Sequence, residues 1–108
     1  MLITVAGPYT ADSEEEMQAN LDAMNNACAE VYKKGHIPVA GMNNALPVVN
    51  RLENINRYDA IMEISLAVVE RYDAILIIGS SPGVIKERDL FEEKKLPVYY
   101  SIEEIPEL

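Results

Sequence analysis

The sequence is poor in cysteine, histidine and basic side chains, and it has no long apolar run. Because it holds a single cysteine and a single histidine, no intrachain disulfide can form, and Cys28 and His36 cannot build a zinc site or a convincing protease pair. One unpaired cysteine suits the reducing cytosol, so we expect a cytoplasmic protein. No uncharged apolar run approaches the about 18–20 residues of a membrane span, which excludes a membrane partner. The first residues, MLITVAGPYT, lack the basic region and small-residue cleavage site of a signal peptide.

Basic residues are outnumbered two to one. Nine Lys and Arg face 18 Asp and Glu, which gives a formal net charge of −9. Binding a nucleic acid polymer needs clustered basic side chains, so that class of partner is excluded. The 49% hydrophobic content is too high for a disordered acidic chain. A length of 108 residues predicts one folded domain that spans residues 1–108.

Short apolar runs alternate with longer segments of helical periodicity. The runs predict strands near residues 2–6, 36–40, 73–78 and 96–100, and the periodic segments predict helices near 13–35, 58–71 and 82–95. This β-α-β-α-β-α-β order predicts an α/β fold, a three-layer α/β/α sandwich around a mostly parallel four-stranded sheet of the flavodoxin-like or Rossmann-like kind. A last helical turn is predicted at 101–104.

Several polar residues at the ends of these elements have structural explanations. Ser13 and Glu16 have the spacing of a helix capping box, and Gly35 is placed to end the same helix. Cys28 lies on the apolar stripe of that helix, so we interpret it as a small core residue. His36 follows at a helix-to-strand junction, and we interpret it as structural.

Residues 41–57 are the part of the chain that the sequence describes least. Five asparagines and a proline favour a long loop with room for one helical turn, and such a segment in a small domain is often a binding loop or lid. The helix predicted next, 58–71, has its main stripe at Ile61, Ile64, Ala67 and Val68 but is apolar on other sides as well. A helix of this kind needs a second partner. In so short a chain we expect another subunit, and therefore a homo-oligomer.

Two loops follow strands where ligands bind in parallel α/β sheets, beyond the carboxyl ends. They cover residues 7–10 and 79–83. Neither is a GxGxxG or Walker A loop, so neither predicts a dinucleotide or P-loop site. We expect no bound cofactor and no metal.

Glu87 is an acid in an apolar sector. Within the predicted helix 82–95 it falls on the side that faces the sheet, where carboxylates seldom lie without a partner or a function. Helical side chains lean toward the N-terminus, so its carboxylate points back over Gly83, whose missing side chain leaves space for a ligand. Ser81 and the first-turn N–H groups can bind an oxygen-rich or anionic group there. The alternative is a boundary residue that pairs with Lys94 or reaches solvent.

Four short motifs in sequence order resemble one superfamily. Nearly the whole chain outside 41–57 is similar to the nucleoside 2-deoxyribosyltransferases and the 2′-deoxynucleoside 5′-phosphate N-hydrolases, through the motifs A-G-P-Y-T, G-H-I-P, Y-D-A-I-L-I-I-G-S-S-P-G-V-I-K-E and K-K-L-P-V-Y. The resemblance implies that Glu87 attacks C1′ of a nucleoside or nucleotide and displaces the base. Water or a second base then resolves the glycosyl-enzyme intermediate.

The resemblance also implies roles for other residues. Ser81 takes a position that is Ser in the hydrolases and Asp in the transferases, which favours hydrolysis. Tyr9 would lie near the sugar and the nucleophile, although a loop aromatic that packs on the sheet edge is the alternative. An acid on the preceding helix, Glu63 or else Asp59, would orient or protonate the base, unless both lie on a solvated helix face. The remaining expected substrate contacts are Gly7, Thr10 and Gly83.

The first loop departs from the hydrolase pattern, because residues 7–12 contain no basic side chain to bind a 5′-phosphate. The substrate expected is a small nucleoside or nucleotide, with or without that phosphate. Two other functions stay open: a non-catalytic nucleotide-binding or sensor module that uses the same cleft, and a structural protein whose main asset is the apolar helix 58–71.

Overall fold

Four short strands form a single sheet. A computed structural model describes all 108 residues and places β1 at Leu2–Ala6, β2 at Ile37–Val39, β3 at Ala74–Ile77 and β4 at Val98–Tyr99. The strand order is β2-β1-β3-β4, and every neighbouring pair is parallel. All four predicted strands are confirmed, and the sheet is entirely parallel. Because β1 is central while β2 and β3 flank it, the chain switches direction beside β1, where flavodoxin-like sheets bind ligands.

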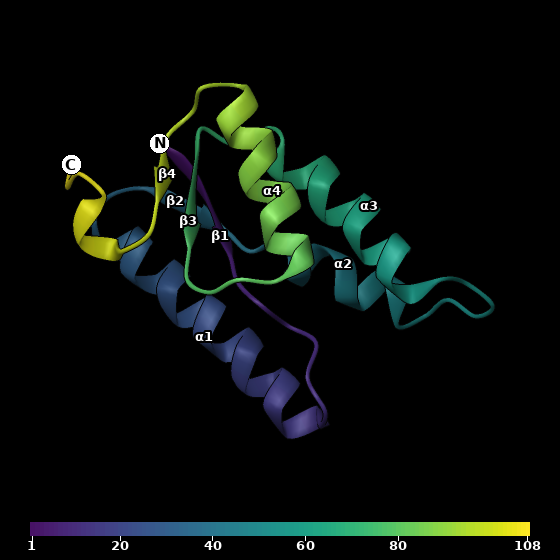
Figure 1. Cartoon of the computed structure of the whole chain (residues 1–108). Coiled ribbons are helices and arrows are strands. Elements are labelled where there is room, and N and C mark those ends of the chain that lie inside the picture. The colour runs from purple at the N-terminus through teal and green to yellow at the C-terminus, as the bar shows by residue number, and fades with distance from the viewer.

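Helices cover both faces of this sheet (Figure 1). They are α1 (Glu14–Lys33), α2 (Gly41–Val49), α3 (Arg57–Val69), α4 (Pro82–Glu93) and the short 3₁₀ helix η1 (Ile102–Glu104). On one face, Met24 and Val31 of α1 pack against Ile3 and Leu76. On the other face, side chains of α3 and α4 pack against Ala6, Ile75 and Ile77. The predicted three-layer α/β/α fold is therefore confirmed. No helix is long and apolar enough to cross a membrane.

The helix ends follow the predicted chemistry. The Ser13 hydroxyl accepts the Glu16 N–H at 3.1 Å, which caps α1. Gly35 lies just past the end of α1 with φ +93°, a conformation in which a side chain is strained. His36 is fully buried, and its Nε2–H donates to the Pro106 carbonyl at 2.6 Å, so its role is structural as expected. Cys28 packs against the core between α1 and the sheet, and burial raises the pKa of its thiol to about 11.

The segment predicted to be a loop begins with a helix, so the loop prediction for 41–57 is wrong over its first half. Helix α2 occupies Gly41–Val49, and only 50–56 connect it to α3. Ala45, Leu46 and Val49 share one buried face, and Pro47 lies near the end of the helix. Burial of that face stabilises α2 despite its asparagines and proline.

Helix α3 does have a second partner, and it lies in the same chain. Helix α2 packs along α3, at a point where a Cβ on Gly41 would approach the Ser65 Cβ to 3.1 Å. The buried positions of α3 are Met62, Ser65 and Val69, whereas positions 61, 64 and 68 of the predicted stripe are half-buried and position 67 is exposed. The apolar character of α3 is thus explained without another subunit, and the homo-oligomer remains a prediction.

Candidate active site

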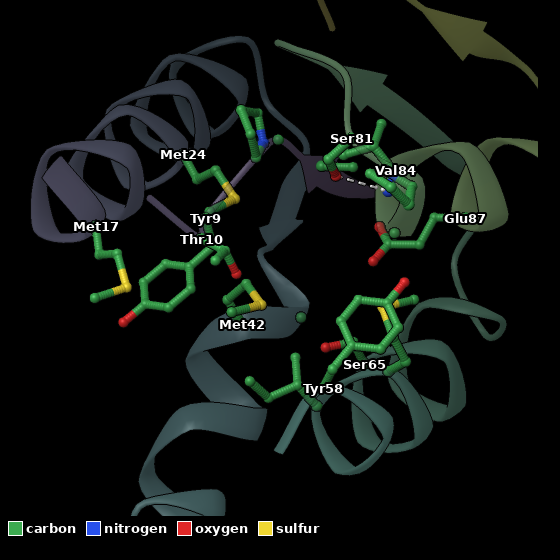
Figure 2. A pocket seen from close by; sticks show the side chains of 18 of the residues that line it. Tyr9, Thr10, Met17, Met24, Met42, Tyr58, Ser65, Ser81, Val84 and Glu87 are labelled. Atoms are coloured by element: carbon green, nitrogen blue, oxygen red, sulfur yellow. Dashed lines mark hydrogen bonds between the residues drawn. The ribbon is translucent and has the colours of Figure 1, made fainter. Parts of the chain in front are cut away.

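A cavity of about 700 Å³ opens at the carboxyl end of the sheet. The loops after β1 and β3, the start of α2, and facing sides of α1, α3 and α4 contribute its wall (Figure 2). Its volume is typical of sites for small molecules. It lies at the expected switch point, because the strands whose ends surround it are β2, β1 and β3.

Six of the residues predicted to form a site lie together on this wall. They are Gly7, Tyr9, Thr10, Ser81, Gly83 and Glu87. They come from the loop after β1 and from the N-terminal cap and first turns of α4, some seventy residues apart in the sequence, which adjacent parallel strands bring to one edge of the sheet.

Glu87 is the only carboxyl group on the cavity wall. Its side chain comes from α4, is half-buried and points into the cavity (Figure 2), and it makes no hydrogen bond or ion pair. Pairing with Lys94 is excluded, because that ammonium group donates to the Glu70 carbonyl at 2.8 Å. Burial without a compensating partner raises the pKa of Glu87 to about 7. At neutral pH this carboxyl group is therefore divided between its protonated and ionised forms.

Ser81 lies at the N-terminus of α4, close to Glu87 in the wall. Its Oγ accepts the Val84 N–H at 3.2 Å, which leaves the hydroxyl hydrogen available to a ligand. The first turn of α4 also has a partial positive charge, which favours an oxygen-rich or anionic group beside Ser81. The space over Gly83 is narrower than the sequence predicts, because a Cβ there would meet the Met62 thioether at 3.0 Å.

The loop after β1 holds Tyr9 against the core and the cavity together. The ring packs against the cluster that includes Met24, and the Tyr9 carbonyl accepts the side-chain amide of Asn20 at 3.0 Å. Tyr9 therefore packs on the core and lines the cavity at the same time. Gly7 lets the backbone pass close to Ile78, since a Cβ on residue 7 would come within 2.8 Å of the Ile78 side chain.

Neither acid expected on the preceding helix reaches the cavity. Asp59 and Glu63 are exposed on α3 and are absent from the cavity wall. The cavity face of α3 carries Tyr58, Met62 and Ser65, and each residue turns a helix by about 100°. The wall residues of α3 at 57, 58, 61, 62 and 65 share one face of the helix, and positions 59 and 63 lie beyond that face. The expected helper acids Glu63 and Asp59 therefore lie outside the cavity that holds Glu87. Helix α3 turns Ser65 toward this cavity instead.

Ser65 is one of several wall residues that the sequence analysis missed. Its side chain is fully buried, and its Oγ has no hydrogen-bond partner in the protein. The hydroxyl end of Tyr58 points toward Glu87 (Figure 2), and the Lys86 ammonium group lies 5.2 Å from the centre of the Tyr58 ring. Residues 58, 61, 62 and 65 have the spacing of one helix face, so helix phase was the signal that could have found them.

Arg57 is the only basic side chain on the wall. Its guanidinium group donates to the Asn50 side chain at 2.7 Å, across the connection between α2 and α3. No three His, Cys, Asp or Glu side chains come together as a metal-binding group.

No protein-family model matches the chain, and no curated protein matches it significantly. Fold and site define an all-parallel flavodoxin-like α/β protein with a cavity at the carboxyl end of its sheet and a single, unpaired carboxyl group on the wall of that cavity.

Proposed function

We propose that this protein cleaves, or exchanges the base across, the N-glycosidic bond of a nucleoside or nucleoside 5′-monophosphate, with ribose or deoxyribose as the sugar. The observation that carries the proposal is the unpaired Glu87 carboxyl group on the cavity wall, next to the Ser81 hydroxyl and the N-terminus of α4. The resemblance described above supports the same chemistry. The substrate is a small cytoplasmic metabolite.

Each step of the reaction can be written on Glu87. Its carboxylate attacks C1′ of the sugar, and the electron pair of the C1′–N bond leaves with the base, which gives a glycosyl ester. Attack on C1′ by water, or by the nitrogen of a second base, breaks the ester bond, releases the carboxylate and gives the free sugar or the exchanged nucleoside. The proton that the attacking water or base loses neutralises the anion of the departed base. This double displacement divides one difficult step into two. Ser81 and the first turn of α4 are suited to hold sugar or phosphate oxygens.

A second candidate is a nucleotide-binding or sensor module without turnover. The observation that favours it is that no second carboxyl group lines the cavity, since Glu63 and Asp59 point away. A departing base then gets no proton from a carboxylic acid of this chain. The phenols of Tyr9 and Tyr58 are the remaining acidic O–H groups on the wall.

The test measures free base released from a panel of nucleosides and 5′-monophosphates by chromatography. We expect release by the wild type, loss of at least 10³-fold in Glu87→Gln, and no recovery in Glu87→Ala, because the nucleophile is removed. Glu63→Gln is the matched control, since it removes an exposed acid outside the cavity and should keep full activity. No release of any base by the wild type overturns the enzyme proposal. Calorimetric binding of a monophosphate that Glu87→Gln leaves unchanged would then support the sensor.

A further inference from the structure

Methionines gather at the cavity. The sequence has five, and four of them line this one space: Met17, Met24, Met42 and Met62. They come from three different helices, α1, α2 and α3, which converge only in the folded protein. The fifth, Met1, precedes β1 and lies at the other end of that strand, roughly 15 Å away at the usual rise per residue.

Three of these side chains form what we name the methionine wall, which consists of Met17, Met24 and Met42. Figure 2 shows it around the Tyr9 ring, across the cavity from Ser81 and Glu87. Met24 is fully buried, whereas Met17 and Met42 are half-buried. None of the three methionine side chains offers a strong hydrogen-bonding group, and the polar groups beside them are the Tyr9 phenol and the Thr10 hydroxyl (Figure 2).

The two sides of the cavity therefore suit different parts of a ligand. Sugar hydroxyls and phosphate oxygens lose free energy when they leave water without hydrogen-bond partners, so they belong with Ser81 and the first turn of α4. Thioethers are polarisable and flexible, and they contact aromatic rings favourably. A flat heteroaromatic ring is the part of a nucleoside that gains most from the methionine wall.

We infer that the methionine wall binds the base of the ligand through its face, and that it selects for an aromatic ring with little preference among bases. Strong discrimination between bases requires buried polar groups that pair with their edges, and an apolar pocket discriminates weakly. This inference rests on the proposed function for the position of the sugar. Binding of the ring itself does not require cleavage.

Methionine methyl groups supply a direct test. The protein is labelled with [methyl-¹³C]methionine in the Glu87→Gln background, so that no turnover occurs, and single Met→Leu variants assign the five resonances. Adenosine, uridine and ribose 5-phosphate are titrated in turn. We expect ring-current shifts at Met17 and Met42 with both nucleosides, none with ribose 5-phosphate, and no shift at Met1 with any of them. Saturating nucleoside without ring-current shifts at these two methyl groups overturns the inference, whether or not the wild type releases base.

Affinity measurements test the selectivity. On Glu87→Gln, calorimetry should give dissociation constants within about tenfold for adenosine, inosine, uridine and cytidine. Met42→Ala should weaken all four by a similar factor of about five to ten, whereas the control Met1→Leu, outside the cavity, should change them less than about threefold. A preference above 100-fold for one base contradicts the inference. If the nucleosides bind in this way and the wild type releases no base, the proposed cleavage fails and the methionine wall stands.

Discussion

At the scale of single residues, Glu87 differs from the other carboxyl groups in its surroundings. Exposed acids such as Glu63 keep their hydration, whereas the Glu87 side chain loses part of its hydration and gains no hydrogen bond or cation in return. The α4 N-terminus near Ser81 favours a negative charge, but it does not offset burial, since the pKa of Glu87 rises to about 7. Unpaired burial of this kind is typical of groups that act on a ligand.

The raised pKa of Glu87 predicts that this side chain lowers stability as pH rises. Its pKa is about 7 in the folded protein against 4.5 for a freely hydrated carboxyl group, so well below pH 4.5 both states are protonated and no penalty exists. Between these values the unfolded state releases its proton first, and above pH 7 the penalty is complete. Its upper limit is about 3 kcal/mol, which remaining contact with water reduces.

Urea unfolding at several pH values measures this effect. We expect Glu87→Gln to gain about 1–3 kcal/mol relative to wild type between pH 4.5 and pH 8, because the neutral amide carries no such penalty. Glu63→Gln should show no comparable change in its difference from wild type. A Glu87→Gln difference that stays constant over this range contradicts the assigned burial.

For the proposed enzyme, kcat/KM should rise with an apparent pKa near 7 as the carboxylate forms.

At the scale of elements, the N-terminus of α4 combines a cap with a ligand position. Ser81 accepts the Val84 N–H and still has a hydroxyl hydrogen, so its cap and the proposed ligand contact can be separated by substitution. Ser81→Ala should lower the free energy of unfolding by about 1 kcal/mol, whereas Ser81→Gly, which is tolerated at a cap, should lower it by a few tenths.

Both Ser81 variants lack the hydroxyl, so both should bind nucleoside or monophosphate about tenfold more weakly than wild type. Calorimetry and urea unfolding on the same samples compare the two effects, and Ser81→Thr, which keeps a hydroxyl, is the control. If Ser81→Gly binds as tightly as wild type, the serine is a cap alone.

The elements also show what the sequence could predict. Strands β1 and β3 and the ends of α1 and α4 were recoverable, because short β-branched runs, Ser caps and Gly35 act locally. Helix α2 was missed because its asparagines and Pro47 oppose a helix locally, and its stability comes from packing on α3. The local helix preferences of residues 41–49 give no information about this contact with α3.

The same limit applies to the candidate site. Glu87, Ser81 and Tyr9 were predictable, since each lies at the end of a strand or in the first turns of the following helix. Sequence position alone identifies Glu63 and Asp59 as acids of the preceding helix, but it does not give the rotation of α3 about its axis. That rotation depends on α2, and it turns Ser65 toward the cavity in place of Glu63.

At the scale of the whole molecule, the topology explains why one cavity holds all these groups. The order β2-β1-β3-β4 places the carboxyl ends of three adjacent strands side by side, and each is followed by residues of the wall. Helices α2 and α3 then extend away from the sheet as a hairpin, whose connection at 50–56 projects from the body (Figure 1). The molecule measures 44 × 29 × 20 Å, so it is distinctly elongated.

Apolar side chains remain exposed around the projecting end of this hairpin. Val48, Leu52 and Ile55 are each 42 to 49% exposed, although they lie within eight residues of one another. Single exposed apolar residues are ordinary, but a group of them marks an interaction surface. We therefore predict that the homo-oligomer expected for this protein forms through the α2–α3 hairpin, and not through the buried stripe of α3.

Sedimentation velocity over a concentration series measures this association. The wild type should sediment as a dimer or larger species, and Leu52→Glu with Ile55→Glu should shift it to the 12.0 kDa monomer, because two buried charges oppose an apolar interface. Tyr32→Glu is the matched control: Tyr32 is 66% exposed on α1, outside the hairpin, and its replacement should leave the oligomer intact. A wild type that stays monomeric at all concentrations contradicts the prediction. If the oligomer survives the double substitution, its interface lies outside the hairpin. Any residues that a neighbouring subunit adds to the cavity then come from that other interface.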